Sequence, residues 1–223
     1  MEKLITLFLF GISFSETTEF MVSFLGLDAA KVEITEKDTI FNGYEAKSIT
    51  FKTETVSASK TFFPVDNTYH TIIKNDFSRI LYFQKSTSQP WLKNNLKTSV
   101  VDNKIFYENS SIEIPTNYLN IFSLLELVNH ITITELLDKQ FYLDREGRRY
   151  TALFKKGENL DELLLDLNVL DEDVNSVIEE TDIFTWAVFR EGAKRILRIK
   201  NGKLVYCEFS LGFVTMKAEI VEK

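Results

Sequence analysis

The sequence predicts a mainly β protein: a strongly curved antiparallel sheet, open like half a barrel, with one or two short helices. Three observations support this fold class. The turn signals Asn42-Gly43, Asp102-Asn103 and Asn201-Gly202 each separate two runs that are rich in aromatic and β-branched residues. Such turn residues favour the positive φ angles of tight hairpins. Helical patterns are few, and with only 8 Gly and 3 Pro no flexible linker divides the chain.

The hairpin at Asn201-Gly202 can be followed in register. Pairing Lys200 with Lys203 places apolar residues opposite each other and then an opposite-charge pair, which stabilises an antiparallel pair of strands. The expected pairs are Ile199 with Leu204, Leu197 with Tyr206, Ile196 with Cys207, Arg198 with Val205, and Arg195 with Glu208. The hairpin at Asp102-Asn103 likewise places Val100 opposite Ile105 and Thr98 opposite Tyr107.

Further strands follow from short runs of β-forming residues bounded by turn residues. They are expected at Phe20–Leu25, Lys31–Ile34, Glu45–Val56, Thr68–Lys74, Arg79–Gln84, Phe141–Asp144, Tyr150–Phe154, Leu163–Val169 and Val214–Val221. Helices are expected at Asn120–Asn129, which has a helical spacing of apolar residues, and at Asp171–Glu180, which has an acidic first turn. We expect one continuous sheet with a helix packed against it. The alternative is an arrangement of two halves that divide near residues 117–130.

The first 15 residues have the layout of a secretory signal peptide. Lys3 gives a positive start, Leu4–Ile12 is an uncharged and mostly apolar run, and the small residues Ser13 and Ser15 suit a cleavage site. We therefore expect residues 1–15 to be removed and residues 16–223 to form a single β-rich domain. The localisation expected from this is periplasmic or otherwise exported. No other stretch is long and apolar enough to predict a membrane-spanning helix.

Composition excludes several classes of function. Lys plus Arg number 26 and Asp plus Glu 33, for a net charge of −7, which argues against a nucleic-acid partner. The single cysteine, Cys207, excludes an intramolecular disulfide and a zinc site built from Cys pairs. We expect it to be a buried thiol rather than a nucleophile. No nucleotide-binding loop is present, and we expect neither a cofactor nor a bound metal.

Some carboxylates invite a catalytic or metal-binding interpretation. Residues 171–182 loosely match a calcium loop, but Ser176 stands where that loop needs glycine and Asp182 stands where it has glutamate. Glu158, Asp161 and Glu162 cluster before a predicted strand, and paired carboxylates can hydrolyse glycosides. A solvated acidic segment explains both patterns equally well. The sequence predicts no catalytic residue.

Aromatic residues on or beside the predicted strands are the candidates for a ligand groove. A curved sheet has a concave face that is either filled by side chains or hollow and apolar, and a hollow face suits an acyl chain. The candidates are Phe62, Tyr82, Phe83, Trp91, Phe106, Tyr107, Phe141 and Tyr142. An ordinary aromatic core is the alternative.

The order of features resembles a bacterial exported family. Glu19–Ile34 contains a strand, an apolar turn with glycine, small residues and a second strand, and Ile114–Val128 places a proline before a short helix. Ala193–Ile199, followed by Gly202 and a strand to residue 220, fits a closing hairpin. In these features the chain resembles the proteins of domain of unknown function 3108, although Asn120 stands where that family tends to have Asp, and Ala30 where it often has Gly.

The resemblance implies an exported, antiparallel β protein whose sheet is similar to the open half-barrel of lipoprotein-localisation factors, which wrap an apolar groove around acyl chains. It implies no catalytic residue. The leading hypothesis is a non-catalytic periplasmic protein that binds an apolar, lipid-like ligand or an envelope protein. The alternatives are an adaptor that pairs through a sheet edge and an envelope hydrolase that uses acidic residues.

Overall fold

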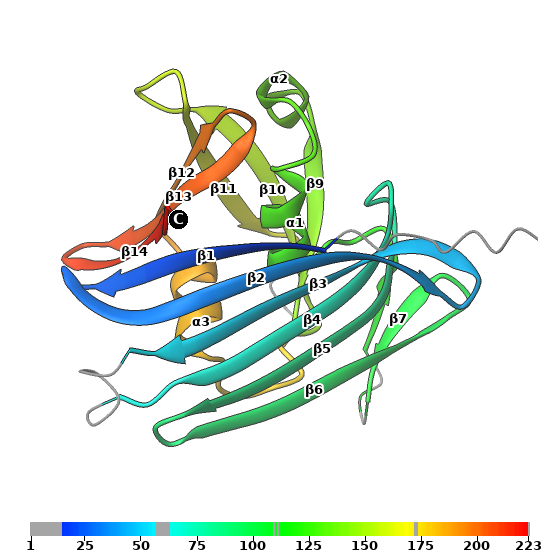
Figure 1. Ribbon diagram of the computed structural model, residues 1–223. Helices are drawn as coiled ribbons and strands as arrows, with labels where there is room; N and C mark the ends of the chain where they lie inside the picture. Colours follow the sequence, from blue (N-terminus) through cyan, green and yellow to red (C-terminus); the bar gives the residue numbers. More distant parts are fainter. Residues whose placement is uncertain (1–14, 57–62, 109, 111, 172–173, 223) are drawn as a thin grey trace, which may run out of the picture.

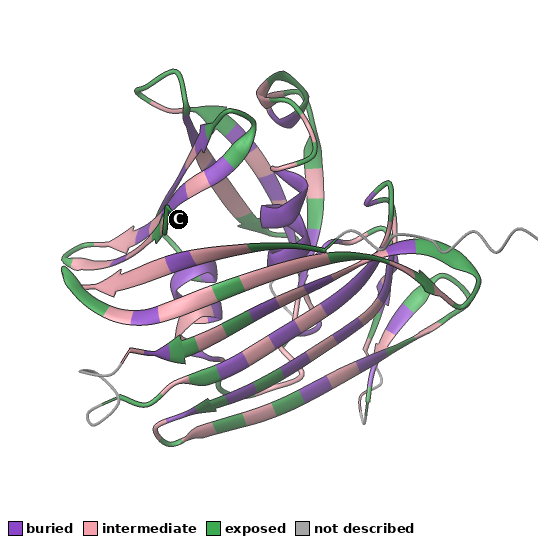
Figure 2. Ribbon diagram, viewed as in Figure 1, coloured by how far each residue is buried: buried purple, intermediate pink, exposed green. Residues whose placement is uncertain are grey.

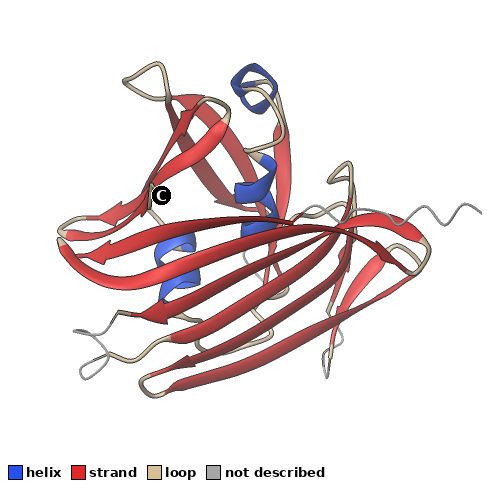
Figure 3. Ribbon diagram, viewed as in Figure 1, coloured by secondary structure: helices blue, strands red, loops and turns tan. Residues whose placement is uncertain are grey.

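Fourteen antiparallel strands form one sheet in the computed structural model, which describes residues 15–56, 63–108, 110, 112–171 and 174–222. The strands are β1 (Ser15–Phe24), β2 (Leu27–Phe41), β3 (Tyr44–Thr55), β4 (Asp66–Lys74), β5 (Ile80–Gln89), β6 (Leu92–Val101), β7 (Lys104–Tyr107), β8 (Glu113–Pro115), β9 (Gln140–Arg145), β10 (Arg148–Lys156), β11 (Glu162–Val169), β12 (Lys194–Lys200), β13 (Lys203–Leu211) and β14 (Val214–Ile220). The prediction of a mainly β, antiparallel fold is confirmed, and strands dominate the described chain in Figure 3.

The chain builds this sheet as two meanders that meet at its first and last strands. The spatial order runs from β8 back to β1, then to β14, and from β14 back to β9. β1 and β14 pair from Phe20 opposite Ile220 to Phe24 opposite Met216. The sheet is continuous, as predicted. The two meanders nevertheless divide at the segment between β8 and β9, the region where the two-half alternative placed a boundary.

The sheet curves almost into a closed barrel, further than the half-barrel that the sequence predicts. Its two end strands, β8 and β9, are joined through Leu119. The Leu119 N–H donates to the carbonyl of Tyr142 at 2.8 Å, and the Asp144 N–H donates to the carbonyl of Leu119 at 2.7 Å. This short bridge satisfies backbone groups that an open edge would leave unpaired.

Three short helices accompany the sheet in the described residues: α1 (Ile121–Leu127), α2 (Ile133–Leu137) and α3 (Ile183–Phe189). α1 confirms the predicted helix, and Asn120 caps it by accepting a hydrogen bond from the Ser123 N–H at 2.8 Å. α2 was not predicted. Its capping box, in which Thr132 and Glu135 bond to each other's backbone N–H, was a readable signal, but the helix that follows has only five residues.

The predicted helix at residues 171–180 is wrong, because the third helix begins only at Ile183 and residues 174–180 form bends and coil. Asp182 ends the acidic segment and caps α3 by accepting a hydrogen bond from the Thr185 N–H at 3.0 Å. The physical reason is burial. Asp182 is buried against Lys85 and Tyr69, which fixes the start of α3, while Val177 and Ile178 pack against the core from the irregular segment before it.

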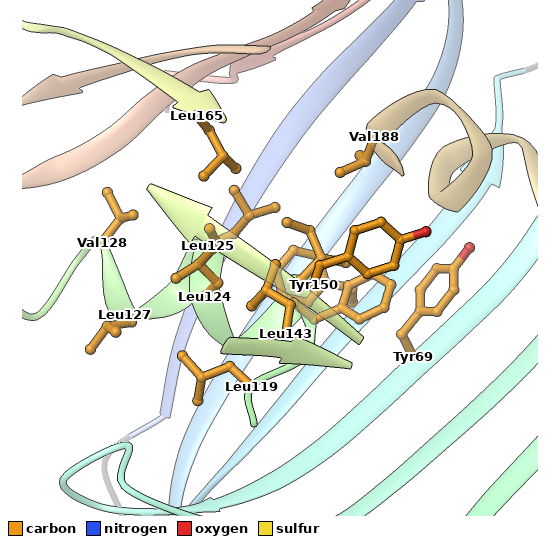
Figure 4. Close-up of a cluster of buried hydrophobic side chains, with 14 of the residues drawn as sticks. Tyr69, Leu119, Leu124, Leu125, Leu127, Val128, Leu143, Tyr150, Leu165 and Val188 are labelled. Carbon is orange, nitrogen blue, oxygen red and sulfur yellow. The ribbon is translucent and has the colours of Figure 1, made fainter. Parts of the chain in front are cut away.

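Helices α1 and α3 fill the inside of the barrel. Figure 1 shows α3 behind β1 and β2, and α1 beside β9 and β10 behind the same strands. Every residue of α1 is buried, as are four residues of α3 (Figure 2). Figure 4 shows side chains of α1, of α3 and of β4, β9, β10 and β11 meeting in one cluster. One hydrophobic core therefore joins the two meanders.

The register of the β12–β13 hairpin starts as predicted and then shifts. Lys200 lies opposite Lys203 and Ile199 opposite Leu204, but a β-bulge follows, so that Arg198 pairs with Tyr206 rather than with Val205. The remaining predicted pairs are wrong by one residue, including Ile196 with Cys207, Leu197 with Tyr206 and Arg195 with Glu208. The predicted register of the β6–β7 hairpin, with Val100 opposite Ile105 and Thr98 opposite Tyr107, is confirmed.

Tertiary packing explains the bulge, because the extra residue in β13 lets Cys207 and Phe209 face the same inner cavity as Leu204. Arg195 also has a partner other than the predicted one. Arg195 is buried, and its guanidinium donates to the backbone carbonyls of Val188, Arg190 and Ala193 at the carboxyl end of α3. A cation there satisfies carbonyls that have no partner within the helix and complements the helix dipole. Arg195 is thus a cap for α3 rather than one half of a cross-strand ion pair, which local pairing rules could not foresee.

Candidate functional site

A row of small side chains lies on the inner face of the wall that β1, β2, β13 and β14 form. Val22 of β1 lies opposite Ala30 of β2 on one side and opposite Ala218 of β14 on the other. Ala218 in turn lies opposite Cys207 of β13. Directly paired residues share one face of a sheet, and Val22, Ala218 and Cys207 contact the core. Small side chains in such a row leave space that longer ones would occupy.

A cavity of about 50 Å³ occupies this space, between the wall and the two inner helices. Its wall is formed by Val22, Cys207 and Ala218 among others, and its floor by Leu125 of α1 and Phe184 of α3. All the side chains that line it are apolar or a thiol, so it is an environment for hydrocarbon rather than for water.

A second hollow of about 90 Å³ lies beside the first and has a polar mouth. The two hollows share four lining residues, which are Phe20, Ile34, Leu125 and Leu204. Glu16 and Lys203 stand at the mouth and form an ion pair, with 2.9 Å between Lys203 Nζ and Glu16 Oε1. The two hollows are therefore neighbours that share part of their lining.

Exposed apolar residues gather at two hairpin tips, which lie at the end of β1 opposite to Glu16. Leu25 and Leu27 flank the β1–β2 turn and are 54% and 74% exposed, and Phe213 in the β13–β14 turn is 88% exposed. The tips lie side by side, because the Leu25 N–H donates to the carbonyl of Thr215 at 3.1 Å. These tips form an exposed apolar patch of the kind found at many binding sites, but none of the three residues lines either hollow.

A buried ionic cluster lies elsewhere in the interior and anchors α3. Lys85 of β5 contacts Glu146, which is in the β9–β10 turn, and its Nζ lies 2.6 Å from Asp182 Oδ2. Asp182 also accepts hydrogen bonds from Tyr69 OH at 2.7 Å and from Thr185 Oγ1 at 2.7 Å. The ammonium of Lys85 lowers the pKa of Asp182 against the opposing effect of burial. The cluster is fully partnered, so its role is to hold β5, the β9–β10 turn and α3 together.

Asp144 is the buried carboxyl next to this cluster. It accepts hydrogen bonds from Tyr107 OH and from the Gly147 N–H, the latter at 2.9 Å. Burial, helped by the nearby charge of Glu146, raises the pKa of Asp144 to about 7, against the opposing effect of these hydrogen bonds. The adjoining hollow measures about 20 Å³, which has room for about one water molecule and none for a sugar.

The predicted groove residues do not form a single set. Phe83, Tyr107 and Phe141 belong to the interior cluster or pack against it. Tyr82 is half-buried beside Phe41, and Phe106 is half-buried. Trp91, in the β5–β6 turn, is 95% exposed, Tyr142 is exposed beside Tyr118, and Phe62 lies outside the described residues. The hollows are lined instead by a different set, of which Phe20, Phe51, Phe184 and Phe209 are the aromatic members.

The other candidate groups are engaged in structural contacts. Asp182, the last position of the apparent calcium loop, binds Lys85, and Asp171, the first position, pairs with Arg149. Glu162 is buried and accepts a hydrogen bond from the Glu158 N–H at 3.2 Å. Cys207 is buried as predicted, and burial raises its pKa to about 12, which keeps the thiol protonated and unreactive.

The sequence held weak signals for the residues that were missed. Lys85 follows Phe83 by two positions, so the alternation of a strand already places both on the same face. The same alternation places the small residues Ala30 and Ala218 on the opposite face from their immediate neighbours in β2 and β14. Nothing local shows that residues almost 200 positions apart form adjacent parts of one wall, because that depends on the pairing of β1 with β14.

Comparison with known proteins supports the fold. No family model matches the chain, and no curated protein does. Among solved structures the chain is similar to one described as a beta-barrel-like protein of domain of unknown function DUF1849 from Brucella abortus, with 10% sequence identity and a TM-score of 0.52. The likeness covers 92% of this chain and 95% of the other. In the described residues, no helix is long and apolar enough to cross a membrane. The chain therefore has a β-barrel-like fold that also occurs in a family of unknown function.

Proposed function

We propose that the protein is an exported, non-catalytic binding protein of the cell envelope that takes an apolar, lipid-like group into the barrel between β1, β2, β13, β14 and α1. The observation that carries the proposal is the apolar cavity behind the row of small side chains, continued by the second hollow and its polar mouth. An acyl chain with a polar head matches this arrangement, with hydrocarbon inside and the head near Glu16 and Lys203.

The present hollows are smaller than ordinary ligand pockets, which measure about 300–1,000 Å³. Binding of a whole acyl chain therefore requires Phe20, Leu125 or Leu204 to move. Each Å² of apolar surface removed from water contributes roughly 25 cal/mol, before the costs of opening and association are subtracted. Leu125 belongs to a short helix inserted into the barrel, so movement of α1 would widen both hollows together.

Export is part of the proposal and rests on residues 1–15, of which residues 1–14 lie outside the described part of the chain. We also propose that the chain belongs to the exported family of domain of unknown function 3108, on the basis of its resemblance at Glu19–Ile34, Ile114–Val128 and Ala193–Ile199. Expression of the full chain in a Gram-negative host should yield a periplasmic protein whose first residue is Glu16. Recovery of the intact chain from the cytoplasm, with Met1 still present, would contradict export.

The ligand is tested by native mass spectrometry of the purified protein before and after organic extraction. We expect a discrete lipid-sized mass that extraction removes. A bare polypeptide mass in both samples, together with no binding of the apolar dye N-phenyl-1-naphthylamine, would contradict a lipid-binding role.

The site is tested by filling the cavity. Ala218→Ile adds bulk to the inner wall and should weaken dye binding by about tenfold, since a filled cavity excludes the ring. Thr215→Ile is the matched control, because position 215 alternates with 216 and 218 and so lies on the outer face of β14. Equal dye binding by both folded variants would place the ligand elsewhere.

The other candidate functions have less support. Strand addition needs a long, free sheet edge, but β8 has three residues and ends in Pro115, and the edge of β9 is bonded to Leu119. A carboxylate hydrolase needs a cleft, but Asp144 and Glu146 border the hollow of about 20 Å³. For these reasons we propose no catalytic role.

A further inference from the structure

Three potential metal ligands meet at the outer end of α1. Glu36 comes from β2, whereas Glu126 lies in the last turn of α1 and His130 follows shortly after it. One ligand atom of each lies within 4.8 Å of those of the other two. His130 Nε2 is 2.6 Å from Glu36 Oε2 and 3.8 Å from Glu126 Oε1. Residues almost a hundred positions apart are thus brought to one point.

The surroundings favour a positive charge at this point. Glu126 is buried, and its carboxylate stands near the negative end of a helix that has no basic residue in its last turn. The carboxylates of Glu36 and Glu126 both face the imidazole of His130, so a cation bound at this point would have two opposite charges beside it.

The two oxygens of Glu36 have separate partners. Lys47 Nζ donates to Oε1 at 2.6 Å, and it also contacts Asp38 at 3.1 Å. Oε2 is left facing His130. Lys47 therefore orients the carboxylate of Glu36 but leaves Oε2 available to a metal. Residues that hold the ligands of a metal site in place commonly bind them in this way. Asn129 Nδ2 donates to Glu126 Oε1, the oxygen that faces His130, at 3.0 Å and holds that carboxylate in place. A carboxylate oxygen has two lone pairs, so Oε1 can accept this bond and still bind a metal.

We propose that Glu36, Glu126 and His130 bind one zinc ion, with water as the fourth ligand. Imidazole nitrogen and carboxylate oxygen are ordinary zinc ligands, at about 2.0–2.2 Å from the metal. In tetrahedral geometry such ligands lie about 3.3 Å apart, so the 2.6 Å contact lengthens and the 3.8 Å contact shortens, each by a small side-chain movement. The His130 side chain is 30% exposed, which leaves access for the metal and the water.

Zinc at this point would tie the outer wall of the barrel to the helix inside it. Glu36 belongs to β2, and Glu126 also lines the polar mouth of the second hollow. A bound ion would then restrict the movement of α1. The zinc site does not depend on the proposed lipid function, and either can fail without the other.

The test is isothermal titration of the full, folded chain with ZnCl₂ after treatment with a chelator. We expect one zinc ion per chain. His130→Ala should weaken binding by about 100-fold, as expected for removal of a ligand. His70→Ala is the matched control, since His70 is the other histidine and bonds to Ser48 Oγ at 2.9 Å on β3.

A second measurement keeps the test independent of variant folding. In the wild-type protein, zinc should shift the imidazole NMR signals of His130 and leave those of His70 in place, whereas Ca²⁺ should shift neither. Absence of zinc binding, binding that His130→Ala leaves unchanged, or a shift confined to His70 would each overturn the site and show that the cluster is an ion pair only.

Discussion

At the scale of single residues, the interior of this barrel contains ionisable groups whose behaviour depends on burial. Asp144 is buried beside Tyr107 and Glu146, and burial raises its pKa from 3.8 to about 7. An unfolded chain would ionise this carboxyl near its ordinary pKa, whereas the folded protein keeps the proton until about neutral pH. The folded state therefore binds more protons between pH 4 and 7, so Asp144 makes folding less favourable as the pH rises through that range.

Asp144→Asn should remove this pH-dependent cost. The free energy of unfolding of the variant, relative to wild type, should rise between pH 4 and 7 by at most about 1.4 kcal/mol per pH unit. Urea unfolding at pH 4.5, 5.5 and 6.5 measures the difference. A difference that is constant over this range, or that falls with pH, would show that the Asp144 carboxyl is ionised in the folded protein throughout.

At the scale of elements, short helices are stable here because the barrel surrounds them. A helix of seven residues is marginal in water, but α1 is buried on all sides and α3 is fixed at both ends. Asp182, bound to Lys85, caps the start of α3, and the guanidinium of Arg195 donates to the carbonyls of Val188 and of the C-cap residue Arg190. The position of α3 is therefore determined by strands far away in the sequence.

Lys85→Met tests this anchoring. Removal of the ammonium leaves Glu146 and Asp182 buried without their cation, so the free energy of unfolding should fall by about 3–5 kcal/mol. Lys93→Met, on the exposed side of β6, is the matched control and should change stability by less than about 0.5 kcal/mol. Urea unfolding at pH 7 compares the two. Similar losses in both variants would mean that the buried ion pair does not hold α3 in place.

At the scale of the whole molecule, the two meanders are separate stretches of the chain, but they share one hydrophobic core. Residues of β3–β5, of β10–β13 and of both inner helices belong to a single hydrophobic cluster. The pairing of β1 with β14 closes the seam between the meanders. Chains of this size often unfold in stages, but the large core here is common to both meanders, and the separate cluster of Ala46, Ile72 and Leu81 in the first meander is small.

We therefore expect both meanders to unfold together. In a Trp91→Phe variant, Trp186 on α3 is the single tryptophan and reports on the filled interior, while far-UV circular dichroism reports on the whole sheet. The two urea midpoints should coincide. Well-separated midpoints would show that one meander is stable without the other, in contradiction to a shared core.

Much of the fold follows from local signals. The turns at Asn42-Gly43, Asp102-Asn103 and Asn201-Gly202 all form hairpins, and Asn42, Asp102, Asn103 and Asn201 have positive φ, as such turns require. The helix after Pro115 was also readable, because Asn120 and the apolar spacing lie within a few residues of each other. The candidate site was not predicted. The aromatics on the strands were visible, but which of them face inward depends on β-bulges such as the one beside Arg198.

The sequence by itself determined the antiparallel β class, most strands and hairpins, helix α1 and the burial of Cys207, because each depends on residues that are close in the chain or on the character of a single side chain. The tertiary structure alone decided that β1 and β14 close the wall, that α3 begins at Ile183, and that Val22, Ala218 and Leu125 enclose a cavity. These features depend on pairing between distant segments. A one-residue shift in register moves a side chain to the other face of the sheet, and no local pattern records that choice.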